Sequence, residues 1–320
     1  MSAAVQTGGA TPRPPGPPHH FLDDLFTRRA LWVTGKGGTG KSTISAALAL
    51  LASERGLKTL LIDVEANGDA ARFLDAGASR SEPREARTNL FHLALHPQEV
   101  LDEYLHVAMK VPRVRRFGPI RKVFEFIATA APGIKEVLIA GKVGFEERAM
   151  DGARPRWDVI VVDAAPSGQV VSHLRGPRTI QEIVDVGLIR NQTAWVREIL
   201  EDPEKTGVVV VSLPEEMPVT ETTELLAHLP KEVKTPVLAV IANRVVEVAD
   251  DAALDAVAQA SDGALAEAAH LWLDLARSER PYIEQLRELG PPTAAVPLIG
   301  FDHHDLAATK AIASALESSS

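Results

Sequence analysis

Residues 35–43 combine the types and spacing that bind nucleotide phosphates. They read Gly35-Lys36-Gly37-Gly38-Thr39-Gly40-Lys41-Ser42-Thr43 and fit the pattern G-x-x-x-x-G-K-[ST]. The glycines let backbone N–H groups converge on phosphate oxygens, and the N-terminus of a following helix adds partial positive charge. Lys41 is expected to reach the β- and γ-phosphates, and the Ser42 hydroxyl is expected to ligate Mg²⁺. We therefore predict that ATP and Mg²⁺ bind this loop.

A second lysine, Lys36, follows the first glycine of the loop. A triphosphate with Mg²⁺ keeps a net negative charge, so a second cation would offset the charge that develops during phosphoryl transfer. The alternative is a solvated surface lysine.

Carboxylates and an amide follow three further apolar runs. Asp163 ends the run that begins at Trp157, where it is expected to hold the Mg²⁺ shell through water. Asp63 and Glu65 lie on the same side of another strand, and either could approach the γ-phosphate or the metal. The alternative for these two acids is a helix N-cap cluster. Asn243 could donate to and accept from an adenine edge, or be an ordinary turn asparagine.

The elements that must position these residues alternate between short apolar runs and helical patterns. This alternation is typical of a parallel sheet covered on both faces. Strands are predicted over 30–34, 59–64, 90–96, 157–163, 207–213, 237–242 and 293–297, and helices over 42–54, 217–229, 250–277 and 304–317. We predict an α/β fold with a doubly wound, mostly parallel sheet of about seven or eight strands, forming a single P-loop domain over residues 21–320.

Three segments extend this framework. A helical insertion is predicted over about 98–150 and a shorter helical segment over about 178–201, while the Pro-rich residues 1–20 are expected to be a disordered tail. A basic cluster interleaved with apolar residues runs from Lys110 to Lys122 in the insertion. A protein or membrane-associated partner could bind there, or the cluster could be a solvated helical face.

Composition excludes several classes of function. The net charge of −9 and the pI near 5.6 argue against nucleic acid as a partner. The chain has no cysteine, which excludes disulfides, thiolate metal sites and cysteine nucleophiles. No apolar run approaches the roughly 18 residues that a membrane-spanning helix needs. The cytoplasm is the expected location.

The loop with its second lysine resembles the deviant Walker A ATPases, which include the ParA/MinD and ArsA groups. The run from Asp163 to Gln169, D-A-A-P-S-G-Q, is similar to the D-T-A-P-T-G-H switch of ArsA-type ATPases. Residues 131–136 resemble a segment that ArsA-like and tail-anchored-protein-targeting ATPases share, and Pro214-Glu215 with Glu221 resembles their P-E…E segment. The combined set is specific to the ArsA-like group and extends from about residue 28 to the C-terminus.

This resemblance implies an ATPase that works as a nucleotide-controlled dimer, either a homodimer or a heterodimer with a paralogous ATPase. Lys36 would point across the interface to phosphates held by the partner. Glu65 would orient the attacking water, with Asp63 in support. Asn243, followed by Arg244, matches the adenine-reading V-N motif. Pro297 and Leu298 resemble the run that completes the adenine pocket.

Departures from the family pattern define the alternatives. Without cysteine, an arsenite site built from thiolates is excluded. The family usually has aspartate at the position of Glu65, so an ATP-binding scaffold or regulatory subunit with little intrinsic hydrolysis is one alternative. A ParA/MinD-type positioning ATPase is the other, although the acidic charge argues against DNA binding.

Overall fold

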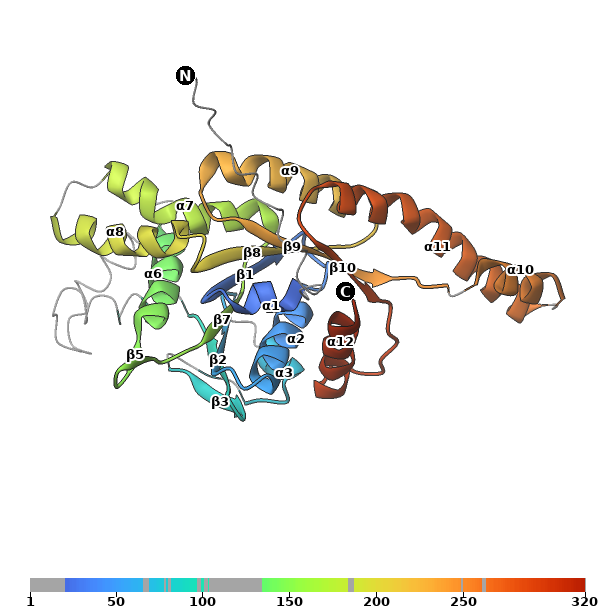
Figure 1. Cartoon of the computed structure of the whole chain (residues 1–320), viewed down its shortest axis with the longest axis horizontal. Helices are drawn as coiled ribbons and strands as arrows, with labels where there is room; N and C mark the ends of the chain where they lie inside the picture. The colour runs from blue at the N-terminus through green and yellow to red at the C-terminus, as the bar shows by residue number, and fades with distance from the viewer. Residues whose placement is uncertain are drawn as a thin grey trace, which may run out of the picture.

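A mostly parallel sheet lies between helices at the centre of the fold (Figure 1). The computed structural model describes residues 21–65, 69–77, 79, 82–96, 99–100, 103, 134–183, 187–248, 250–260 and 263–319. Within this part of the chain the main sheet has eight strands in the order β10-β9-β8-β1-β7-β2-β4-β3. In chain order they are β1 (Ala30–Gly35), β2 (Thr59–Asp63), β3 (Arg84–Arg87), β4 (Leu90–Ala94), β7 (Val159–Asp163), β8 (Thr206–Ser212), β9 (Val237–Val245) and β10 (Thr293–Pro297).

Neighbouring strands of this sheet run parallel, except that β3 pairs antiparallel with β4. Every residue of β1, β2, β7 and β8 is buried, as expected for continuous Val, Ile and Leu runs covered on both faces. The fold prediction is therefore confirmed, and each predicted strand lies at its expected place in the sequence.

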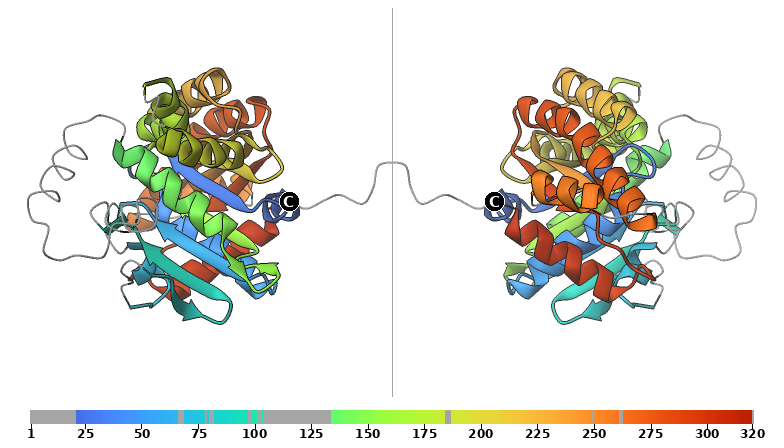
Figure 2. Two further views of the ribbon diagram at one scale, coloured as in Figure 1. Left: turned by 90° about the vertical axis from the view of Figure 1, so that its left-hand side faces the viewer. Right: turned by 90° about the vertical axis from the view of Figure 1, so that its right-hand side faces the viewer.

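Two hydrophobic cores cover the two faces of the sheet, and alternate residues of one strand enter different cores. In β1, Trp32 joins one core while Leu31 and Val33 join the other. The face with Leu31 is covered by α1 (Phe21–Phe26), α2 (Lys41–Glu54), α3 (Asp69–Phe73) and α12 (Leu306–Ser318). The face with Trp32 is covered by α6 (Ile134–Arg148), α7 (Ser167–Ile183), α8 (Gly187–Glu201), α9 (Glu216–Glu232) and α11 (Ala264–Glu288), and both layers are visible in Figure 2.

The strand order reverses at the carboxyl ends of the central strands. The connection after β1 passes through α2 to β2 on one side, whereas the connection after β7 passes through α7 and α8 to β8 on the other side. Loops that diverge in this way leave space for a ligand at the point where the strand order reverses. The residues predicted to bind nucleotide follow these strands.

The helices that follow β7 differ from the prediction. The segment predicted over about 178–201 begins earlier, at Ser167, and is divided into α7 and α8. The local preference of Gly176-Pro177 disfavours a continuous helix, yet α7 continues through these residues. A Cβ atom at Gly176 would lie 3.0 Å from a methyl group of Val137, so glycine allows α6 to pack closely here. Packing against α6 and α8 thus outweighs the local preference.

The insertion predicted over about 98–150 is only partly described. Its last part forms α6, which ends two residues before the predicted boundary, and β5 (Met150–Asp151) then pairs with β6 (Arg154–Pro155). The run from Lys110 to Lys122 and residues 1–20 lie outside the described residues.

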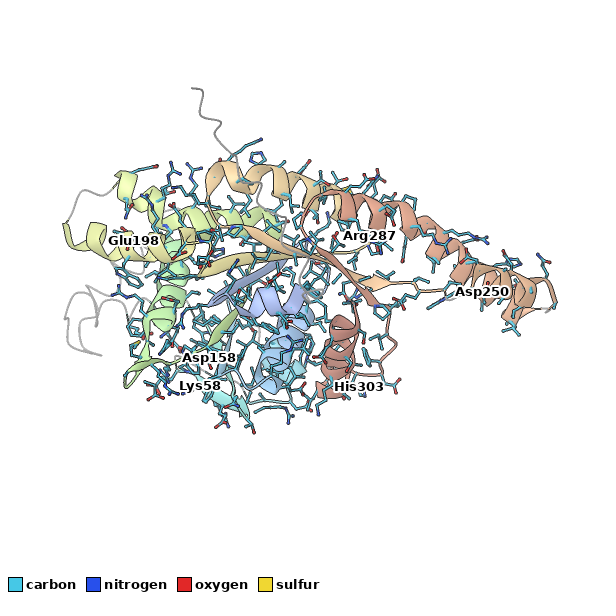
Figure 3. The ribbon with its side chains drawn as sticks, viewed as in Figure 1. Lys58, Asp158, Glu198, Asp250, Arg287 and His303 are labelled. Atoms are coloured by element: carbon cyan, nitrogen blue, oxygen red, sulfur yellow. The ribbon has the colours of Figure 1, made fainter. Side chains whose placement is uncertain are left out.

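The stretch predicted to be helical over 250–277 forms two helices that extend beyond the sheet, as Figure 1 shows, and the second of them, α11, continues to Glu288. Figure 3 labels Asp250, which precedes α10 (Asp251–Ala260), and Arg287, near the end of α11. Among the described residues, no helix combines the length and the apolar character that crossing a membrane requires.

Candidate functional site

The loop between β1 and α2 has a shape that only glycine permits at two positions. Gly35 has φ 151° and Gly40 has φ 92°. A Cβ atom on Gly35 would lie 2.0 Å from the carbonyl oxygen of Val211, and one on Gly40 would lie 2.3 Å from Nδ2 of Asn243. Side chains here would therefore displace the loop from its neighbours, in addition to the strain of a positive φ.

Hydrogen bonds close this loop on itself. The carbonyl oxygen of Lys36 accepts from Thr39 Oγ1 at 2.9 Å and from Lys41 Nζ at 3.3 Å. Asn243 Nδ2, at the end of β9, donates to the carbonyl oxygen of Thr39 at 2.8 Å. Strand β9 therefore holds the loop in place from outside. Sequence reasoning gave Asn243 a role toward adenine but did not foresee this bond, which joins residues 204 positions apart.

Two carboxylates lie next to each other beside the loop. Asp63 and Asp163 are direct partners in the register of the parallel strands β2 and β7, and they are only 3% and 6% exposed. Ser45 Oγ, one turn into α2, donates to Asp163 Oδ1 at 3.1 Å. The backbone N–H of Glu65 donates to Asp63 Oδ1 at 3.2 Å, and the Glu65 side chain is exposed. The structure thus brings the predicted acids together at the carboxyl ends of β2 and β7.

This arrangement shifts the protonation of both the acid and the lysine. Burial raises the pKa of Asp163 to about 7, and the nearby charge of Asp63 adds to this, while hydrogen bonds from Ser42 and Ser45 and the charge of Lys41 oppose it. Burial lowers the pKa of Lys41, against the opposing charges of Asp163 and Glu65. Closely spaced buried carboxylates would be stabilised by an added cation.

The oxygen donors at these strand ends and in the neighbouring loop fit Mg²⁺. The hydroxyl of Ser42 lies within hydrogen-bonding reach of the Asp163 carboxylate, so two oxygen donors are adjacent. Mg²⁺ prefers oxygen and is usually bound through one or two protein groups, with phosphates and water completing its shell. The raised pKa of Asp163 is the electrostatic sign of a buried acid beside a second acid.

The second lysine of the loop is paired within its own chain. Lys36 Nζ forms an ion pair with Oε1 of Glu221 on α9. The other oxygen of this carboxylate, Oε2, accepts a hydrogen bond from Ser167 Oγ at 3.1 Å. Sequence reasoning noted Glu221 only as part of a family segment and gave it no role. Its sequence separation of 185 from Lys36 left no local signal of the contact.

The residues predicted around adenine are also brought together. The backbone N–H of Leu298 donates to the carbonyl oxygen of Val245 at 2.7 Å, which places the end of β10 beside the end of β9. Asn243 is 5% exposed, whereas Arg244 is exposed and has φ 58°. Leu298 is 42% exposed. Contact of Asn243, Arg244, Pro297 and Leu298 with a base stays a prediction.

Comparison of the sequence with known proteins identifies one family. The model of a family described as anion-transporting ATPase matches residues 28–194 and 185–285. The ATPase BagA of Mycobacterium tuberculosis is 33% identical over 222 residues, which are 66% of this chain and 64% of that relative. The arsenical pump-driving ATPase of Escherichia coli is 28% identical over 213 residues, 60% of this chain and 35% of that relative. The chain thus aligns with under two thirds of the length of either relative.

Proposed function

We propose that this chain, which belongs to the anion-transporting ATPase family, binds ATP with Mg²⁺ and hydrolyses it as a nucleotide-controlled dimer. The observation that carries the proposal is the juxtaposition of the phosphate-binding loop with Asp63 and Asp163, which are paired in register on β2 and β7. A loop that binds phosphates, next to buried acids that suit Mg²⁺, is the arrangement that phosphoryl transfer to water requires.

Phosphate binding would fall to the backbone of residues 35–42 and to Lys41. The N-terminus of α2, with Gly40 as its N-cap, would add its partial positive charge. Ser42 and Asp163 would hold Mg²⁺, the latter through water. When bound, Mg²⁺ neutralises negative charge on the phosphates.

Activation of water would fall to the acids that follow β2. Glu65 is exposed, and its charge acts on Lys41, so its carboxylate would orient a water molecule near the phosphates. Asp63 is buried and accepts the N–H of Glu65, which suits a supporting role that fixes the backbone of Glu65. Glu65 would therefore position the nucleophile while Asp63 holds the turn.

Dimer formation would add Lys36 to the site of the other subunit. The charge that develops during transfer favours an additional cation near the transferred phosphoryl group. The partner would be a second copy of this chain or a paralogous ATPase. Some relatives are named arsenical pump-driving ATPases, but this chain has no cysteine, so its cargo would be recognised without thiolates.

Light scattering with Mg²⁺ and a non-hydrolysable ATP analogue tests the dimer. The wild type is expected to change from monomer to dimer when the analogue is added. Lys36→Ala is expected to bind the analogue but to stay monomeric, because the contact between the Lys36 amine and the phosphates held by the other subunit is lost. A wild type that stays monomeric at saturating analogue would contradict the dimer.

A further inference from the structure

One carboxylate joins three parts of the candidate site. Glu221, in the second turn of α9, pairs with Lys36 Nζ through Oε1 and accepts the Ser167 hydroxyl through Oε2 at 3.1 Å. Ser167 is the first residue of α7, which follows the strand that ends in Asp163. We call this set the Glu221 bridge: Lys36, Glu221 and Ser167. It connects the phosphate-binding loop, α9 and the start of α7.

Within the bridge, the backbone of Lys36 is fixed while its side chain is held only weakly. The carbonyl oxygen of Lys36 accepts hydrogen bonds from Thr39 Oγ1 and Lys41 Nζ. The paired side chains of Lys36 and Glu221 are 30% and 33% exposed. Ion pairs with this exposure are screened by water and are easily exchanged for another anion. The side chain of Lys36 can therefore leave Glu221 without a change in the loop.

We propose that Glu221 is a positioning residue for Lys36. In the nucleotide-free chain its carboxylate holds the Lys36 ammonium at α9, and a nucleotide phosphate displaces this carboxylate when Lys36 is recruited. The inference rests on the proposed function, because the phosphate that recruits Lys36 is expected to be held by the partner subunit. Since Glu221 also accepts from Ser167, the same displacement changes the charge facing the first turn of α7.

The expected size of the effect follows from the exposure of the pair. Loss of a partly exposed ion pair changes an equilibrium by about 2- to 5-fold. A symmetric dimer contains one such pair in each subunit, so the effects of two independent pairs multiply to about 4- to 25-fold in the dimerisation constant. Glu221→Gln removes the charge and keeps the size of the side chain. It is therefore expected to strengthen analogue-dependent dimerisation by that factor.

The test compares dimerisation of four proteins with Mg²⁺ and a non-hydrolysable ATP analogue, by sedimentation velocity over a range of protein concentrations. They are the wild type, Glu221→Gln, Lys36→Ala and the double variant. The gain from Glu221→Gln should vanish in the Lys36→Ala background, because Glu221 acts through Lys36. Glu224→Gln, an exposed residue of the same helix outside the bridge, is the matched control and should behave like the wild type. A Glu221→Gln protein that dimerises no better than the wild type, or that keeps its gain without Lys36, would overturn the inference.

A second measurement separates this inference from the dimer itself. In the nucleotide-free protein, mass spectrometry measures the rate at which acetic anhydride modifies the Lys36 amine. This rate is expressed relative to that of Lys231, an exposed residue of α9. Glu221→Gln is expected to raise this ratio about 2- to 5-fold, and Glu224→Gln is expected to leave it unchanged. If the wild type never dimerises, the proposed function fails, while the labelling ratio still decides the inference. Equal ratios in the wild type and Glu221→Gln would overturn it.

Discussion

Gly40 illustrates how one residue type sets the geometry of the site. Gly40 has a positive φ and directly precedes α2, and the amide of Asn243 occupies the space where a side chain would lie. A side chain at this position would separate the loop from β9, because the Asn243 to Thr39 hydrogen bond passes through the same space. Glycine at this position therefore allows the loop after β1 to lie against the end of β9, which is remote in sequence.

Gly40→Ala is accordingly expected to weaken nucleotide binding by at least about 10-fold, since strain and the contact with Asn243 add together. Titration with a fluorescent ATP analogue measures the affinity. Gly141→Ala, which places the same methyl group in open space on α6, is the matched control and should leave the affinity unchanged. Equal affinities in Gly40→Ala and the wild type would contradict the described loop geometry.

A second prediction at the residue scale concerns His92. It is 1% exposed on β4, and burial lowers its pKa to about 4 from an ordinary value near 6.5. A folded-state pKa below the unfolded one means that stability present above pH 6.5 is lost as the pH falls toward 4. The free energy of unfolding of the wild type, minus that of His92→Gln, should fall by about 2 kcal/mol from pH 7 to pH 5.

Urea denaturation of both proteins at each pH measures this difference. The comparison with His92→Gln is needed because Asp163 acts in the opposite direction. Its raised pKa gives the native state stability that is lost as the pH rises through about 7. This contribution is common to both proteins and cancels. A difference that is the same at pH 7 and pH 5 would show that His92 binds protons equally in the folded and unfolded states.

Individual residues also show which positions sequence reasoning can place in the fold, while their roles stay predictions. The loop from Gly35 to Ser42 and the acid Asp163 could be predicted because their chemistry depends on short local patterns next to strands. The contact of Lys36 with Glu221 and that of Thr39 with Asn243 could not, because they join positions 185 and 204 apart. Only the strand order brings those positions together.

At the scale of elements, buried charged residues of α6 hold this helix against the sheet near the start of β7. Lys142, whose side chain is 6% exposed, pairs with Glu146 at 3.0 Å and with Glu103 at 2.9 Å. The Glu146 side chain is 2% exposed and also accepts from Trp157 Nε1 at 2.9 Å, next to the start of β7. The carboxylate of Glu146 is therefore tolerated in the interior because both oxygens have partners.

Lys142→Met should lower the free energy of unfolding by about 3 kcal/mol, because it leaves the carboxylate of Glu146 buried without its counter-charge. The double variant Lys142→Met/Glu146→Gln should lose less than the single variant, since no buried charge remains. Chemical denaturation measures both. Arg178→Met breaks an exposed pair with Glu182 on α7 and serves as the control, with a change below about 1 kcal/mol. A double variant less stable than Lys142→Met would contradict this account of the pair.

The elements that sequence reasoning missed are the short ones and those held by packing. Helix α1 has six residues and the β5–β6 hairpin has two residues in each strand, too few for any periodicity to appear. Helix α7 continues through Pro177 because it packs between α6 and α8. The central strands were predictable because an uninterrupted Val and Ile run such as Val208–Val211 has one stable place, inside the sheet.

At the scale of the whole molecule, the candidate site lies along the carboxyl edge of the main sheet. Strands β1, β2, β7 and β9 each deliver one part of it: the loop, Asp63, Asp163 and Asn243. Helices α7 and α9 contribute Ser167 and Glu221 from the face that also carries α11. A change at the site can therefore reach the helices of this face directly, through the Glu221 bridge.

Phosphate release from ATP with Mg²⁺ tests the central claim most directly, measured at increasing protein concentration for the wild type, Lys36→Ala and Lys41→Ala. We expect wild-type turnover per chain to rise with protein concentration, because the active form is the dimer. We expect each variant to lose at least about 100-fold, because each removes a cation that stabilises the transferred phosphoryl group. A wild type that binds ATP but releases no phosphate, or a Lys36→Ala protein with full turnover, would contradict the account.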